Sequence, residues 1–200
     1  MNDNLALEKK ILEQKRKDIL NEVEQKKRYQ EEIQKKLISV TKEAKGSYSQ
    51  EKENTEKIYM LLKKEIENYE EALKNPYFGR VDFDEKFGSQ EKIYIGKKGI
   101  TSTYDGEEIV VDWRAPVADL YYSGTGGEAY YKAPMGVVEG DLNLKRKFLY
   151  NEENLSKIFD EGTNEIIING EEGEGLVDEF LKINLEESRG KKLKEVVATI

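Results

Sequence analysis

The feature that most constrains this chain is its first 74 residues, which contain no proline and a single glycine, Gly46. The stretch is built mainly from Glu, Lys, Gln, Leu and Ile, whose side chains lose little rotamer freedom in a helix. Glycine adopts the backbone angles at which helices commonly end, and Ser47 is suited to cap the helix that follows. We therefore expect two helices joined at Gly46 and Ser47.

Apolar residues in this stretch recur at helical spacing. In the first helix a seven-residue step, with two flanking positions, links Leu5, Leu12, Ile19, Val23, Ile33, Leu37 and Val40. In the second helix the stripe consists of Tyr48, Thr55, Ile58, Leu62, Ile66, Tyr69 and Leu73. Two stripes separated by one glycine predict an antiparallel helical hairpin, a coiled-coil arm, over residues 1–75.

The predicted hairpin is too long to bury much of itself. Its first helix, of about 40 residues, would extend roughly 60 Å, so the hairpin should project from a body. An alternative is a coiled coil between two chains that acts as a dimerising adaptor. Polar Lys26, which interrupts the seven-residue step, and Gly46 in the middle favour a hairpin within one chain, and hence a monomer.

The composition changes at Asn75 and Pro76. Every other glycine and all three prolines follow this point, and the acidic excess follows it too: residues 1–74 hold 17 basic and 16 acidic side chains, and the remainder holds 16 and 25. Short β-branched and aromatic runs separated by glycine-rich turns are typical of strands. These runs are 80–83, 92–95, 99–103, 108–111, 129–132 and 137–150. They predict an antiparallel sheet or small open barrel over residues 76–160.

Residues 161–200 return to a helical pattern, with apolar stripes at Leu176, Val177, Phe180 and Leu181, and at Leu193, Val196 and Val197. The last stripe reaches Ile200 without a stop signal. The expected fold class is therefore α+β, with a long helical hairpin on a mainly antiparallel β domain and helices at the end.

Composition excludes several kinds of chemistry. The chain has no cysteine and no histidine, so it has no thiol nucleophile, imidazole base or zinc-finger site. The glycine-rich segments 124–127 and 170–175 lack the Gly-Lys-Ser/Thr ending of a phosphate-binding loop. The net charge of −8 gives no general affinity for nucleic acid, and no apolar run is long enough to span a bilayer. We expect no catalytic residue, metal or cofactor in these 200 residues, and a cytoplasmic protein.

Three segments remain as candidates for contacts. The first joins the hairpin to the sheet and contains Pro76, Tyr77, Phe78, Gly79 and Arg80. The second leaves a strand and contains Asp112, Trp113, Arg114 and Pro116. Both are expected to be structural, with Trp113 in the core and Arg114 paired to an acid or stacked on a ring. A binding role for Arg114 is the alternative. The third is the basic triplet Lys145, Arg146 and Lys147, a candidate contact for nucleic acid.

Several motifs occur in one order along the chain. They are Pro-Tyr-Phe-Gly-Arg-Val-Asp-Phe at 76–83, Tyr-Ile-Gly at 94–96, Val-Asp-Trp-Arg-Ala-Pro-Val at 111–117, Tyr121-Tyr122, Pro-Met-Gly at 134–136 and Leu-Lys-Arg-Lys-Phe at 144–148. Together they resemble the N-terminal region of the HelD class of UvrD/Rep-like superfamily-1 helicases, also called helicase IV-like. The final Val196–Ile200 resembles the segment that leads into the glutamine motif of that family.

The resemblance implies a non-catalytic N-terminal part of an ATP-dependent helicase, whose ATPase follows and uses ATP and Mg. In that family the hairpin is an arm that enters the secondary channel of bacterial RNA polymerase and helps to release nucleic acid. The residues near its turn would then contact the polymerase. Here these are Glu43, Lys45, Tyr48, Glu51 and Glu53. The alternative is an accessory DNA-binding domain of a DNA helicase.

Overall fold

The computed structural model describes residues 3–44, 48–124 and 126–161. Two helices come first, α1 (Asp3–Ala44) and α2 (Gln50–Ala72). Seven strands follow, interrupted by a short helical segment after the fourth. They are β1 (Gly79–Glu85), β2 (Gln90–Gly96), β3 (Ile100–Thr101), β4 (Glu108–Asp112), the 3₁₀ turn η1 (Pro116–Ala118), α3 (Asp119–Ser123), β5 (Gly127–Ala133), β6 (Gly136–Asn151) and β7 (Asn154–Glu161).

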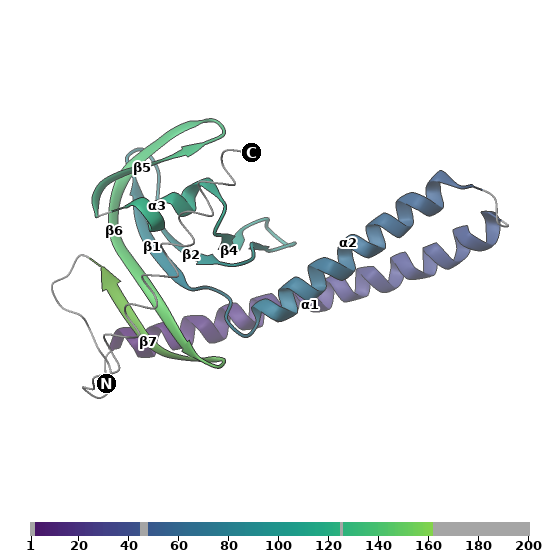
Figure 1. Ribbon diagram of the computed structural model, residues 1–200, viewed down its shortest axis with the longest axis horizontal. Coiled ribbons are helices and arrows are strands. Elements are labelled where there is room, and N and C mark those ends of the chain that lie inside the picture. Colours follow the sequence, from purple (N-terminus) through teal and green to yellow (C-terminus); the bar gives the residue numbers. More distant parts are fainter. Residues whose placement is uncertain (1–2, 45–47, 125, 162–200) are drawn as a thin grey trace.

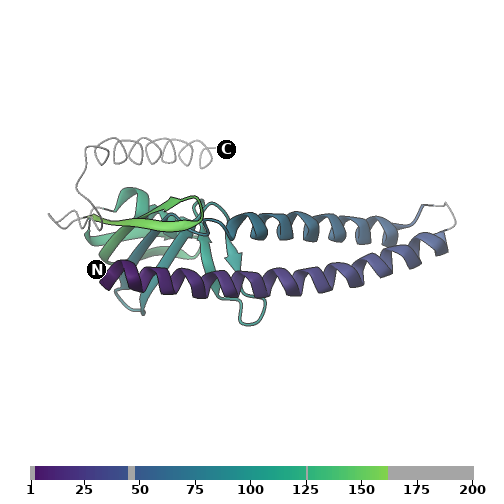
Figure 2. The ribbon, with the colours of Figure 1, turned by 90° about the horizontal axis from the view of Figure 1, so that it is seen from below.

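The first half of α1 lies along the sheet, and its second half extends beyond the sheet with α2 beside it (Figures 1 and 2). Lys26 of α1 pairs with Glu65 of α2, and Lys36, further along α1, pairs with Glu51, which comes earlier in α2. These pairs show that the two helices run in opposite directions. We call residues 27–44 and 48–64 the projecting helix pair. The buried side chains between its helices are Ile33, Val40, Thr55 and Leu62.

Polar Lys26 lies at this helix interface rather than pointing into solvent. Its side chain is 12% exposed, its Nζ lies 5.1 Å from the centre of the Tyr69 ring, and it pairs with Glu65 at 3.1 Å. The stem of a lysine can cover an apolar surface while its charge reaches a partner. The interruption in the seven-residue step therefore does not interrupt the packing of α1 on α2.

The strands form one sheet in the order β3-β4-β2-β1-β6-β5, and β7 pairs with β6. Six of the strand pairs are β1–β2, β1–β6, β3–β4, β5–β6, β6–β7 and β2–β4, and all but the last are antiparallel. After β2 the chain reverses direction in β3 and reverses again in β4. β4 therefore runs in the same direction as β2, and the two strands pair in parallel. The expected α+β fold with a mainly antiparallel sheet is confirmed, and β2–β4 is the parallel pair among these six.

Two separate cores cover the two faces of the sheet. On one face α1 and the end of α2 pack on β2, β4, β6 and β7, through residues that include Leu12, Ile19, Tyr69, Tyr94, Phe148 and Ile158. On the other face η1 and α3 pack on the sheet, through residues that include Val81, Phe83, Ile95, Leu120, Tyr121 and Leu142. The helices therefore form layers on both sides of a single sheet.

Some expectations differ in detail from the structure. The cap of α2 is Ser49, whose side chain accepts a hydrogen bond from the Lys52 N–H at 3.3 Å, and Ser47 lies outside the described residues. β7 and the η1–α3 segment have no counterpart among the predicted elements. Ile58 is 40% exposed although it belongs to the predicted stripe. The helices predicted within residues 161–200 lie outside the described residues, apart from Glu161, which ends β7.

None of the helices in residues 3–44, 48–124 and 126–161 combines the length and the apolar character needed to cross a membrane.

Candidate functional site

A buried ionic cluster holds the start of α1 against the sheet. Glu8 has no exposed surface, and its Oε1 accepts hydrogen bonds from Arg80 Nη1 at 2.6 Å and Arg146 Nη1 at 2.7 Å. Arg80 and Arg146 stand opposite each other on β1 and β6. One helical carboxylate thus joins two neighbouring strands.

Each of these arginines has a further carboxylate of its own. Arg80 donates two hydrogen bonds to Asp82, at 2.6 and 2.5 Å, and Arg146 donates two to Asp160, both at 2.6 Å. Burial opposes the charge of each guanidinium, but the hydrogen bonds to Asp82 and Asp160 and the nearby Glu8 outweigh it and raise the pKa of both arginines. Full pairing of this kind is what makes buried charges tolerable.

The cluster is structural, and sequence reasoning missed its centre. Glu8 lies three residues after Leu5 and four before Leu12, so it falls on the apolar stripe of α1. An acidic side chain at such a position is the signal that would have indicated a buried partner. The buried Tyr94 OH also donates to Glu8 Oε2, at 3.1 Å.

The segment from Pro76 to Arg80 joins α2 to the sheet. Pro76 and Tyr77 are fully buried, and the Tyr77 ring meets the rings of Tyr94 and Phe148 edge-on at 4.7 and 4.9 Å. These ring contacts place the segment in the first core. Because this segment connects α2 to β1, it fixes the point at which the projecting helix pair joins the sheet.

Phe78 and Gly79 fit the segment to the second core. The Phe78 N–H donates to the Ile95 carbonyl, and the Phe78 carbonyl accepts from the Phe148 N–H, both at 2.9 Å, so residue 78 bridges two strands. A Cβ on Gly79 would lie 2.5 Å from the ring of Tyr121. Only glycine leaves room for that ring.

The Asp112–Pro116 segment turns from β4 into η1. Trp113 is half-buried against the second core, and Pro116 is the first residue of η1. Arg114 is exposed and donates two hydrogen bonds to Asp112, both at 2.8 Å. Partial burial opposes the charge of Asp112, but the bonds from Arg114 outweigh it and lower the pKa of Asp112. Of the two arrangements expected for Arg114, the structure has the pairing with an acid.

The basic triplet of β6 is directed into the protein. The side chains of Lys145, Arg146 and Lys147 are 11%, 6% and 4% exposed. Both lysines pair with Glu161, at 2.7 and 2.6 Å, and Arg146 pairs with Glu8 and Asp160. In this structure the triplet stabilises the β6–β7 pair and does not present its charges to a nucleic acid.

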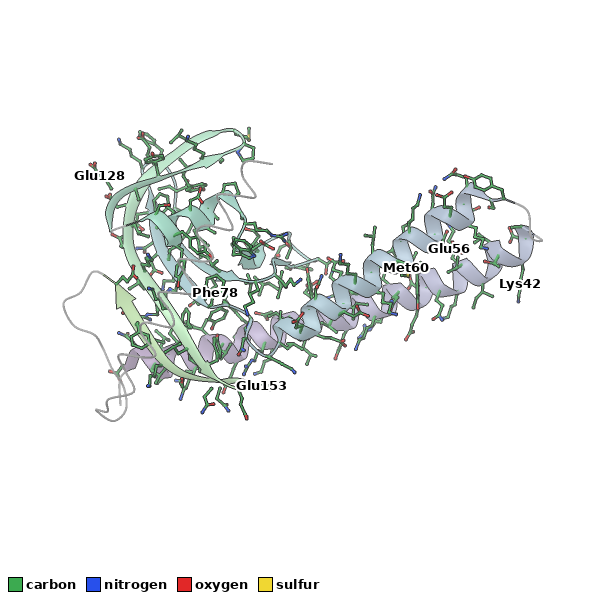
Figure 3. The ribbon with its side chains drawn as sticks, in the orientation of Figure 1. Lys42, Glu56, Met60, Phe78, Glu128 and Glu153 are labelled. Carbon is green, nitrogen blue, oxygen red and sulfur yellow. The ribbon has the colours of Figure 1, made fainter. Side chains whose placement is uncertain are left out.

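Of the predicted tip residues, Glu43 belongs to the last turn of α1, Tyr48 comes just before α2, and Glu51 and Glu53 belong to its first turn. These helix ends form the far end of the projecting helix pair, where Figure 3 labels Lys42. Tyr48 is 79% exposed, and its OH donates to Gln50 at 2.6 Å and Glu53 at 3.1 Å. Lys45 lies outside the described residues.

The tip carboxylates have local partners. Glu43 accepts from the Ser39 hydroxyl at 3.0 Å, and Glu51 pairs with Lys36 across the two helices at 3.1 Å. Glu53 pairs with Lys57 at 2.6 Å, and hydrogen bonds from Lys57 and Tyr48 lower the pKa of Glu53. The described tip therefore offers an exposed aromatic ring beside carboxylates that each have a hydrogen-bond or ion-pair partner.

A cavity of about 420 Å³ lies on the outer face of β5 and β6, with Lys86 beside it. Its carboxylates come from Glu128, Glu139 and Asp141, and Lys86 pairs with Glu139 at 3.6 Å. Among the described residues no three acidic side chains are close enough to hold a metal ion. The geometry gives this cavity no catalytic group beyond solvated carboxylates.

Comparison with known families gives one match that covers most of the chain. Residues 5–174 match the family described as DNA helicase IV HelD, N-terminal domain. A search of curated proteins finds no match. The matched residues include the ionic cluster, both joining segments and the projecting helix pair.

Proposed function

Because this chain belongs to the family of HelD N-terminal domains, we propose that it is the non-catalytic N-terminal part of a HelD helicase and binds bacterial RNA polymerase through its projecting helix pair. ATP and Mg²⁺ serve the ATPase part of such a protein in this proposal. The pair would enter the secondary channel and help to release nucleic acid from stalled polymerase.

The observation that carries this proposal is the shape of the projecting helix pair. α1 has 42 residues and α2 has 23, so the helices extend about 63 and 35 Å at ~1.5 Å per residue. Figure 1 shows their far ends well beyond the sheet, with only each other for support. A body two helices wide fits a narrow opening, because each helix is about 10–12 Å across with its side chains.

The charges of the projecting pair favour recognition by shape. Lys27 pairs with Glu70, Lys36 with Glu51, and Lys57 with Glu53, so basic and acidic side chains neutralise one another along the helices. Such exposed pairs contribute little to stability, and residues 27–44 and 48–64 together keep a modest basic excess, with nine basic and six acidic side chains. A narrow surface on which several charges already have partners is suited to an enclosed protein surface.

The test is co-elution of the 200-residue chain with purified core RNA polymerase in gel filtration. The informative variant replaces residues 29–62 with a short glycine-rich turn, which keeps the Lys26–Glu65 pair and the core residues that contact the sheet. We expect binding by the parent chain and its loss in the shortened variant. No co-elution of the parent even at low salt would refute the proposal, as would equal binding by the shortened chain.

A tip variant makes the test more specific. Tyr48→Ala removes an aromatic ring that is 79% exposed, and should weaken polymerase binding without changing the melting temperature. Tyr104→Ala is the matched control, because Tyr104 is 92% exposed on the loop between β3 and β4. Equal weakening by both variants would contradict a role for the tip.

The alternative of an accessory DNA-binding domain finds less support, because the basic triplet of β6 is buried and paired. Titration of a labelled oligonucleotide tests it directly. We expect no salt-dependent binding in the micromolar range, and such binding would revive the alternative.

A further inference from the structure

β5 ends the main path of the sheet and has one unpaired edge. It pairs with β6 over seven residues, from Gly127–Leu142 to Ala133–Gly136, and no described strand pairs with its other side. The pairing has no register shift, unlike β1–β6, β3–β4 and β6–β7. The opposite end of the sheet is β3, which has only two residues. A straight seven-residue edge is a template for another strand.

The side chains of β5 alternate between two environments. Ala129 and Tyr131 face the second core and are half-buried there. Glu128, Tyr130 and Lys132 are exposed on the other face, and Figure 3 shows Glu128 pointing away from the sheet. The exposed face thus carries an acid, an aromatic ring and a base at regular two-residue spacing.

This pattern is complementary to itself in one orientation. In an antiparallel pair of two copies centred on Tyr130, Glu128 of each copy stands opposite Lys132 of the other. Ala129 then stands opposite Tyr131, and the two Tyr130 rings are neighbours. Opposite charges and aromatic rings placed directly across from each other stabilise a strand pair.

Other registers lack these features. Centring on Tyr131 places Glu128 opposite Pro134, which has no N–H to donate. Centring on Ala129 moves Lys132 beyond the end of the partner strand. A parallel, in-register pair would set Glu128 against Glu128 and Lys132 against Lys132, which is destabilising.

We propose that two copies of this chain associate through their β5 edges, in an antiparallel register centred on Tyr130, so that the two sheets become continuous. A lone lysine on an edge strand usually discourages pairing, but here Glu128 of the second copy neutralises it. The proposal concerns association of the chain with itself at high concentration and is independent of polymerase binding. It revises the expectation of a strict monomer.

Sedimentation equilibrium tests the proposal at protein concentrations from a few micromolar to several hundred micromolar. The buffer contains about 0.15 M salt, because a screening length of about 8 Å weakens the repulsion between two chains of net charge −8. We expect the mass to rise from 23.1 kDa toward twice that value. A constant 23.1 kDa over the whole range would overturn the proposal.

Charge reversal tests the register. Glu128→Lys and Lys132→Glu each place like charges opposite each other twice, so each variant alone should dimerise on the order of tenfold more weakly. A mixture of the two variants restores both opposite-charge pairs, and so does the double variant; both should recover the parent's association. Lys97→Glu, an exposed change of the same charge on the β2–β3 turn, is the control and should leave association unchanged.

Circular dichroism of each variant confirms that it is folded. Association that persists unchanged in the single variants would overturn the proposal, because the contact would then lie elsewhere. A mixture that fails to recover association would refute the antiparallel register.

Discussion

Replacing Glu8 with glutamine removes one charge from the centre of the ionic cluster with almost no change of volume. The Glu8 carboxylate has no exposed surface and holds Arg80 and Arg146 at 2.6 and 2.7 Å. Each arginine keeps its own aspartate in the variant, but two buried guanidinium groups then face each other without the carboxylate between them. The polar attachment of α1 to β1 and β6 would then depend on a neutral amide oxygen in place of the carboxylate.

Removing one partner from a buried charge pair costs about 3–5 kcal/mol. In a chain of this size each kcal/mol lowers the melting temperature by about 2–4 °C, so Glu8→Gln should lower it by roughly 6–20 °C. The assay is thermal unfolding followed by circular dichroism at 222 nm, at pH 7. Glu13→Gln is the matched control, since Glu13 is an exposed acid on the same helix, and should change the melting temperature by less than about 2 °C.

A double-mutant cycle with Arg80→Gln isolates the pair, and the coupling free energy should be about 0.5–3 kcal/mol. A melting temperature of Glu8→Gln within about 2 °C of the parent would refute the reasoning. It would mean that water or the two aspartates satisfy the arginines, and that apolar packing alone holds α1 on the sheet.

Two further predictions concern the body. Gly96→Ala should destabilise the fold by about 1–3 kcal/mol in denaturant unfolding, because the new Cβ would lie 2.2 Å from the Pro76 carbonyl oxygen. Acid unfolding should show the contribution of Glu161: burial opposes its charge, but hydrogen bonds from Lys145 and Lys147 outweigh this and keep the pKa of Glu161 below its ordinary value of 4.5. The unfolded chain therefore takes up the proton first as the pH falls past 4.5, so the stabilisation from Glu161 is lost below that pH. Glu161→Gln should lower the melting temperature at pH 7. In the variant the melting temperature should also fall less steeply below pH 4.5.

Each of these two predictions has a control in the same part of the chain. Gly99→Ala should be tolerated better than Gly96→Ala, because the atoms nearest its Cβ would be the Asp112 Cβ at 3.2 Å and the Asp112 N at 3.5 Å. Equal destabilisation by both substitutions would contradict the argument from the Pro76 carbonyl. Glu152→Gln changes an exposed acid in the turn after β6, and a melting profile as flat as that of Glu161→Gln would assign the acid loss to general charge effects.

The family and the fold class follow from the sequence to a large extent. Motifs such as Pro76–Phe83 and Val111–Val117 are contiguous, so their order is readable without a structure, and the family match confirms the resemblance. The helices of residues 1–75 and most strands of the body were also predictable, because helix and strand periodicity is a local property of the chain.

The long-range contacts could not be predicted in the same way. Glu8 is 72 residues from Arg80 and 138 residues from Arg146 along the chain, and only the folded sheet brings the three side chains together. Lys145 and Lys147 show the same limit. They look like a basic patch for nucleic acid in the sequence, yet Glu161 at the end of β7 pairs with both.

The sequence by itself determined two long helices, a change of composition at Asn75 and Pro76, a strand-rich body and a family. The tertiary structure decided which charges are buried, that β4 returns parallel to β2, and that β5 keeps a free edge among the described strands. The physical reason is that periodicity and capping act within a few residues, whereas burial, ion pairing and strand order depend on segments that meet only when the chain folds.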